Sequence, residues 1–176
     1  MDKKFIIGIG LLTLLILIGG IWLISAQDTK ESKKLSTPLM GQKIEDMGGG
    51  IHVKRGESHA AYNSNPPTSG PHWGDGTAGP GIHDSEVPDE LLVHSLEHGA
   101  AILWYKSDLP QDQVEKLKNI FNKASGKKIM VPRKDLDVPV ALTSWNYLLK
   151  LQSIDEGQIK AFIETNNDRA PEKAPI

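Results

Sequence analysis

The chain has no cysteine among its 176 residues. This absence excludes disulfide bonds, a lipid anchor on an N-terminal cysteine, thiolate metal sites and cysteine nucleophiles. A metal ion bound by this protein would therefore be held by nitrogen and oxygen atoms. An excess of charge of one sign is lacking too, because 20 Lys and Arg face 22 Asp and Glu. So balanced a chain has no electrostatic footprint for nucleic acid, and we expect no nucleic-acid partner.

Long hydrophobic runs are lacking except at the N-terminus. Residues 5–24 carry no charge, and only Thr13 among them is polar. At 1.5 Å per residue this run spans about 30 Å, the thickness of a bilayer's hydrocarbon core. A cleaved signal peptide is the alternative, because Lys3 and Lys4 precede the run and Ser25-Ala26 offers small residues. Its apolar core is usually only about 7 to 15 residues long, so we expect an uncleaved transmembrane signal-anchor over residues 5–25.

The expected anchor makes this a single-pass protein of the cell membrane. A cytoplasmic tail of four residues with two lysines precedes the run, which favours an extracytoplasmic C-terminal domain. Lys30, Lys33 and Lys34 follow the run, so the positive-inside rule discriminates little. We expect a polar tether over residues 26–44, one domain over residues 45–172 and a short tail over residues 173–176.

The second half of the expected domain has readable secondary structure. Apolar residues at helical spacing predict helices over residues 110–124 and 155–167, the second with a capping box that begins at Asp155. Runs of β-branched and aromatic residues predict strands over residues 100–105, 128–132, 138–145 and 147–151. Because these elements show no regular βαβ alternation, they predict an α+β domain with a small mixed or antiparallel sheet and two C-terminal helices.

Histidine is absent from most of the chain, since all six lie between His52 and His98. Imidazole is the commonest metal ligand in proteins and a frequent general base, so this region is the candidate site. Residues 47–83 are also rich in glycine and proline. Asn65-Pro66-Pro67 and Gly70-Pro71 restrict the backbone, which predicts a long, rigid Gly/Pro/His-rich loop that presents His72 and Trp73.

Three strings of residues are similar to a known family: His59-Ala-Ala-Tyr62, Pro66-Pro-Thr-Ser-Gly-Pro-His72 and Leu92-Val-His-Ser-Leu-Glu-His-Gly99. With them the chain resembles, over roughly residues 40–172, the bacterial family called "domain of unknown function 3105". The resemblance implies no settled activity. It implies that His59, Tyr62, the loop of residues 66–72, Glu97 and His98 belong to the family pattern. His83 stands where that pattern more often has tyrosine.

We expect a transition-metal site with the candidate ligands His72, His94, His98 and His59, and with Tyr62 and Glu97 beside them. A helix over residues 87–98, begun by Pro88 and ended by Gly99, would place His94 and His98 on one face. In a strand those two residues would lie about 13 Å apart and could not share one ion. Nitrogen ligands favour copper or zinc as the cofactor. We expect a surface or core role for His52, in a strand-like run, and set His83 aside.

Two other functions stay open. In the first, the histidines are structural and bond to the loop backbone, and the domain is a noncatalytic ligand- or protein-binding module. In the second, the protein is a metal-dependent hydrolase with Glu97 as candidate base, because His94-Ser-Leu-Glu-His98 fits the H-x-x-E-H pattern of inverted zinc peptidases. That pattern requires a long helix, whereas Gly99 would end the helix at once. Whether the protein is an enzyme stays open at this stage.

Overall fold

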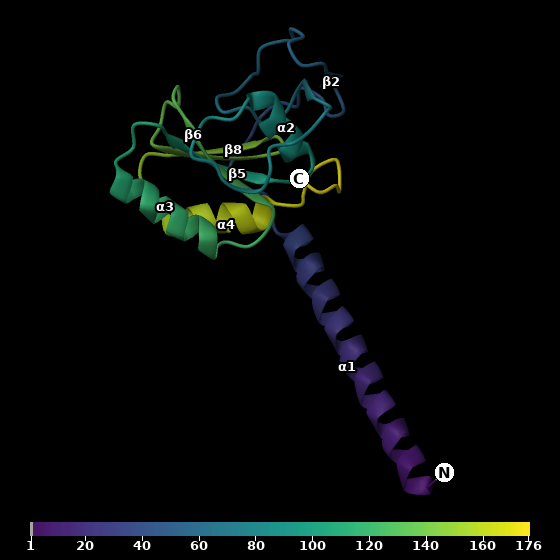
Figure 1. Cartoon of the computed structure of the whole chain (residues 1–176). Coiled ribbons are helices and arrows are strands. Elements are labelled where there is room, and N and C mark those ends of the chain that lie inside the picture. Colours follow the sequence, from purple (N-terminus) through teal and green to yellow (C-terminus); the bar gives the residue numbers. More distant parts are fainter. Residues whose placement is uncertain (1) are drawn as a thin grey trace. The chain divides into compact units, whose positions relative to one another are not determined.

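The computed structural model describes residues 2–176 in two units, which divide between Pro38 and Leu39. The first unit is the helix α1 (Lys3–Ser36), drawn in purple and blue in Figure 1. Its segment Ile7–Ser36 is long and apolar enough to cross a membrane, a test that a signal sequence would also pass. The large apolar side chains between Ile7 and Ile24 are all exposed in the structure.

Polar residues continue α1 beyond its apolar part, as far as Ser36. Adding residues to an existing helix avoids the cost of nucleation, so this segment, which holds three lysines and three serines, can remain helical. The second unit begins at Leu39, and β1 (Gln42–Lys43) already pairs with Leu148 and Tyr147 in its sheet. The unit boundary thus precedes the end of the tether expected over residues 26–44.

A six-stranded mixed sheet forms the centre of the second unit, in the order β1-β8-β7-β5-β6-β4. The strands after β1 are β4 (Gly81–Ile82), β5 (Ala101–Lys106), β6 (Lys128–Arg133), β7 (Val140–Ser144) and β8 (Tyr147–Leu151). Strands β4, β5 and β6 run parallel, and the pairs β5/β7, β7/β8 and β1/β8 are antiparallel. A separate parallel pair joins β2 (His52–Val53) to β3 (His72–Trp73).

Helices cover both faces of this sheet (Figure 1). Side chains alternate along β5, so Leu103 packs with the helices α3 (Gln111–Lys123) and α4 (Glu156–Asn166), whereas Ile102 and Trp104 pack on the opposite face with α2 (Asp89–Glu97). Each face has its own buried apolar cluster. The predicted α+β class with a mixed sheet is confirmed, as are the helices α3 and α4 at their predicted places.

The segment for which the sequence left helix and strand open forms the helix α2. Leu92, Val93 and Leu96 are fully buried and belong to the cluster on the α2 face of the sheet, so helical spacing matches the buried face. Gly99 has φ +90° and ends the helix, and a Cβ atom there would lie 2.9 Å from Asp168 Cα. This helix carries His94, and the pair β2/β3 carries His52 and His72.

Candidate metal centre

Four residues form a cluster, which we call the His/Glu centre: His52, His72, His94 and Glu97. Each offers one ligand atom, and these atoms all lie within 4.8 Å of one another, so the cluster could hold a metal ion. The register of β2 and β3 pairs His52 with His72. His94 and Glu97 are three residues apart on α2 and therefore face the same side. The centre thus joins a helix to a two-stranded pair.

Two of the histidines are held by backbone carbonyl groups. Nδ1 of His72 lies 2.8 Å from the carbonyl oxygen of Gly70, and Nδ1 of His94 lies 2.9 Å from that of Gly76. In the neutral imidazole each Nδ1–H donates to its carbonyl, which leaves Nε2 with a free lone pair. Histidine ligands of metals are commonly oriented in this way by a hydrogen bond from the other ring nitrogen. Both rings are therefore already set for coordination through Nε2.

Two buried atoms in the centre lack a hydrogen bond. Nε2 of His72 and Oε2 of Glu97 lie 3.0 Å apart, yet neither has a partner in hydrogen-bonding geometry. The two side chains are 0% and 1% exposed. Leaving such groups unsatisfied costs roughly 1 to 3 kcal/mol each, and a shared cation would satisfy both.

The protonation of His72 favours metal binding. Burial lowers the pKa of His72, and this effect is opposed by its bond to the Gly70 carbonyl and by the negative charge of Glu97. A lowered pKa means that the imidazole is neutral near pH 7, which is the form that binds metals.

The backbone of residues 49–50 fits around Glu97. The Gly50 N–H donates to Oε1 of Glu97. A Cβ atom on Gly49 would lie 2.8 Å from that same oxygen, so only glycine allows this approach. Oε1 is thereby fixed by the backbone, while Oε2 faces the imidazoles. Three imidazoles and one carboxylate form a donor set that suits zinc and copper, so the residues present fit such an ion.

His98 and His59, two of the expected ligands, lie outside the His/Glu centre. The ring of His98 is 4.5 Å from that of His94, but Nδ1 lies 2.7 Å from the Pro175 carbonyl oxygen and Nε2 lies 3.2 Å from Glu172 Oε2. Both of its ring nitrogens thus face the C-terminal segment. His59 instead faces Glu90 at 3.4 Å and the carbonyl of Ala60.

Tyr62 and His83, which the sequence analysis also discussed, both contact backbone carbonyl groups. Tyr62 donates a 2.7 Å hydrogen bond from its hydroxyl to the Pro71 carbonyl, directly before His72, and its ring lies 5.2 Å from that of His59. The ring of His83 contacts the Gly79 carbonyl through Nε2 at 2.8 Å. His52, for which we expected a surface or core role, is the residue that joins the cluster. Only the pairing of β2 with β3 brings it there, and two-residue strands leave no periodic signal in a sequence.

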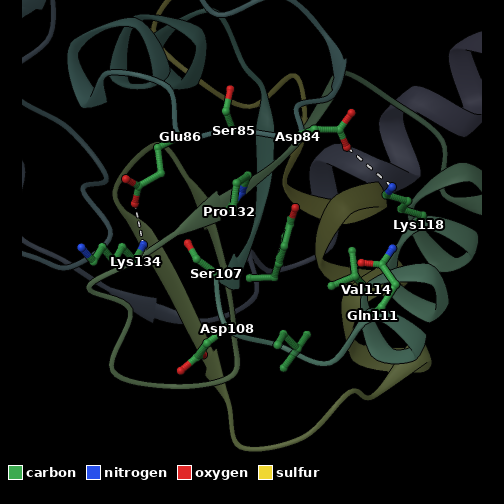
Figure 2. Close-up of a pocket in the computed structure, with 12 residues that line it drawn as sticks. Asp84, Ser85, Glu86, Ser107, Asp108, Gln111, Val114, Lys118, Pro132 and Lys134 are labelled. Carbon is green, nitrogen blue, oxygen red and sulfur yellow. Dashed lines mark hydrogen bonds and ion pairs between the residues drawn. The ribbon is translucent and has the colours of Figure 1, made fainter.

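A cavity of about 790 Å³ lies apart from the His/Glu centre, and none of its lining residues belongs to that centre (Figure 2). It lies where β4, β5 and β6 end and α3 begins. Two of its charged groups pair with each other, since Lys118 Nζ is 3.6 Å from Asp84 Oδ1. Glu86 accepts a hydrogen bond from the backbone N–H of Lys134. Among the described residues, five buried side-chain nitrogen and oxygen atoms lack a hydrogen-bond partner. Two of them belong to the His/Glu centre and none to this cavity, so the His/Glu centre is the stronger candidate site.

The model of the DUF3105 family, described as a protein of unknown function, matches residues 52–175. The chain belongs to this family. The match confirms the resemblance seen in the sequence, and the matched region contains all four residues of the His/Glu centre. No curated protein and no solved structure matches the chain. Since the family description names no activity, the function has to be argued from the centre itself.

Proposed function

We propose that this DUF3105 protein is a membrane-anchored, extracytoplasmic domain that binds a transition-metal ion through His52, His72, His94 and Glu97. The observation that carries the proposal is the pair of buried, unsatisfied atoms, His72 Nε2 and Glu97 Oε2, at 3.0 Å. A purely structural set of histidines would use these lone pairs in hydrogen bonds. Here the Nδ1 atoms of His72 and His94 contact backbone carbonyl groups, and Nε2 of His72 faces Glu97.

Zinc and copper are the proposed ions. Both accept imidazole nitrogen and carboxylate oxygen, and the chain offers no thiolate. Such an ion would act as a Lewis acid and would also join α2 to the loop that carries β3. Glu97 is proposed as a ligand rather than as a base, because one carboxylate oxygen accepts from Gly50 and the other faces His72.

The loop of residues 66–72 is proposed to be a rigid support for His72. Residues 66–70 are buried, which is uncommon for a connecting loop. The Ser69 hydroxyl accepts from the backbone N–H of Met47, and Tyr62 bonds to Pro71. These contacts fix the backbone on both sides of the Gly70 carbonyl that orients the His72 ring.

Metal analysis of the full-length chain, purified in mild detergent without a histidine tag, tests this function. After treatment with chelator, the protein is reloaded with zinc or with copper, and bound metal is counted per chain. We expect one ion in the wild type and in the control His83→Gln, and loss of that ion in His72→Gln. Absence of bound metal, or equal binding by both variants, would refute the proposed centre.

The topology has a separate test that uses the lack of cysteine. Single cysteines are introduced at Ser153, which is exposed in the second unit, and at Lys3, before the apolar run. A membrane-impermeant thiol reagent applied to intact cells should label Ser153→Cys and leave Lys3→Cys unlabelled. The reverse pattern would place the domain inside the cell.

A further inference from the structure

We propose that His52 is the exchangeable ligand of the His/Glu centre: the metal ion enters and leaves on its side, and a small anionic or imidazole-type donor can take its place. This inference rests on the proposed metal site. It adds to that site an open, ligand-accepting position, which distinguishes a centre that reacts or transfers metal from a closed structural one.

Exposure separates His52 from the other three ligands. Its side chain is 46% exposed, whereas those of His72 and Glu97 are 0% and 1% exposed. His94 is also buried. Of the four ligands, His52 is therefore the one whose imidazole is open to solvent.

The His52 ring is also held less firmly. Nε2 of His52 lies 3.9 Å from Glu97 Oε2, compared with 3.0 Å for the same atom of His72. Within residues 2–176 we find no backbone carbonyl that orients the His52 ring, in contrast to the Gly70 and Gly76 carbonyls at His72 and His94. A ligand without such an anchor loses and regains its metal bond at a lower cost.

A surface pocket of about 310 Å³ lies on the exposed side of His52, lined by His52, Val53, Lys54, Arg55, Gly74 and Asp75. A Cβ atom on Gly74 would lie 2.9 Å from Cγ of His52, so glycine leaves the ring its space. Arg55 pairs with Asp75 at 2.7 Å, and Lys54 adds a positive charge at the rim. This balance favours an incoming donor that is anionic or neutral over a cationic one.

Chemical rescue in the cobalt-loaded, full-length chain tests the proposal, because visible Co²⁺ bands report the number of ligands. We expect His52→Gly to keep one ion per chain with about 10- to 100-fold weaker affinity and an altered spectrum. Added imidazole should restore the wild-type spectrum. His94→Gly should not be rescued, because its site is closed to solvent. His83→Gly should match the wild type throughout.

Two further measurements use the same samples. A chelator should extract the ion from His52→Gly at least about 10-fold faster than from the wild type. Azide, the anionic probe, should bind to the Co²⁺ in this variant without releasing it.

An unchanged spectrum and affinity in His52→Gly would show that His52 is no ligand. Failure of both imidazole and azide to bind there would show that the position is not exchangeable. Either result overturns this inference, and a metal site would still stand on His72, His94 and Glu97 in the first case and on all four ligands in the second. Failure of the wild type to bind Co²⁺, zinc or copper would instead overturn the proposed function.

Discussion

Replacing Gly49 by alanine should damage the centre without touching any of its ligands. The added Cβ atom would lie 2.8 Å from Oε1 of Glu97 and 3.4 Å from Cζ2 of Trp145, so the carboxylate or the backbone must move. Overpacking of this kind costs roughly 1 to 3 kcal/mol, and the loss of the Gly50 N–H bond to a charged group falls in the same range. Alanine has less conformational entropy than glycine in the unfolded chain, and this difference stabilises the folded state by only about 0.4 to 1 kcal/mol. We expect Gly49→Ala to lower the free energy of unfolding by about 1 to 2 kcal/mol.

Gly76→Ala is the matched control, because a Cβ atom there meets nothing within 4 Å although the Gly76 carbonyl bonds to His94. Urea unfolding of the metal-free, full-length chain in mild detergent, followed by tryptophan fluorescence, measures both variants. Gly76→Ala should be neutral or slightly stabilising. Zinc affinity should fall about 10- to 100-fold in Gly49→Ala only, because Glu97 is displaced. Equal stability and equal zinc affinity in the two variants would refute the argument that Glu97 is fixed by close backbone approach.

Three further predictions concern residues around the centre. Tyr62→Phe leaves the Pro71 carbonyl without its donor and should lower the free energy of unfolding, measured in urea, by about 1 to 2 kcal/mol. Burial raises the pKa of Tyr62, so above about pH 10 only the unfolded chain loses the proton and the wild-type protein should lose stability. Tyr62→Phe should lose less stability over the same pH range. Arg133→Met removes the two bonds to Asp89, at 2.6 and 3.1 Å, and the contacts of its Nε with Asn65 and Asp135. It should cost about 2 kcal/mol at pH 7, less than the loss of a fully buried pair because Asp89 is 24% exposed. Burial raises the pKa of Asp89, so the carboxyl takes up a proton as the pH falls, and the difference in stability between wild type and variant should become smaller. A difference that stays constant with pH would show that the Arg133–Asp89 pair does not account for it. His98→Ala should keep zinc affinity within about threefold of the wild-type value, and limited proteolysis of residues 172–176 should become faster because the contacts of His98 with this segment are lost. A loss of zinc affinity as large as that in His72→Gln would show that His98 is a ligand.

The four longer strands of the sheet and the helices α3 and α4 follow from the sequence because their signals are local, whereas the two-residue strands β1 and β4 were not predicted. Apolar residues at helical spacing predict α3 and α4, and the capping box at Asp155 is present, with the side chain accepting from the Gln158 N–H at 2.9 Å. For residues 87–98 the sequence left helix and strand open. The packing of Leu92 and Leu96 beneath the α2 face of the sheet decides for the helix.

The ligand set was harder to predict because it depends on contacts between distant residues. His52 and His72 are 20 residues apart and meet only through a two-residue parallel pair, which has no periodic pattern. His98 has the expected spacing from His94, but it is the C-cap residue of α2, and its ring contacts the C-terminal segment. Spacing along a helix could therefore indicate His94 as a member of the centre, and it could not distinguish His98 from Glu97.

X-ray absorption spectroscopy of the zinc-loaded, full-length chain tests the His/Glu centre most directly, because it counts the imidazoles around the ion. The account predicts a first shell of nitrogen and oxygen at about 2.0 to 2.1 Å with scattering from three imidazole rings, and the loss of one ring in His52→Gly. A shell with one imidazole or none, or a spectrum unchanged by that substitution and by His72→Gln alike, would contradict it.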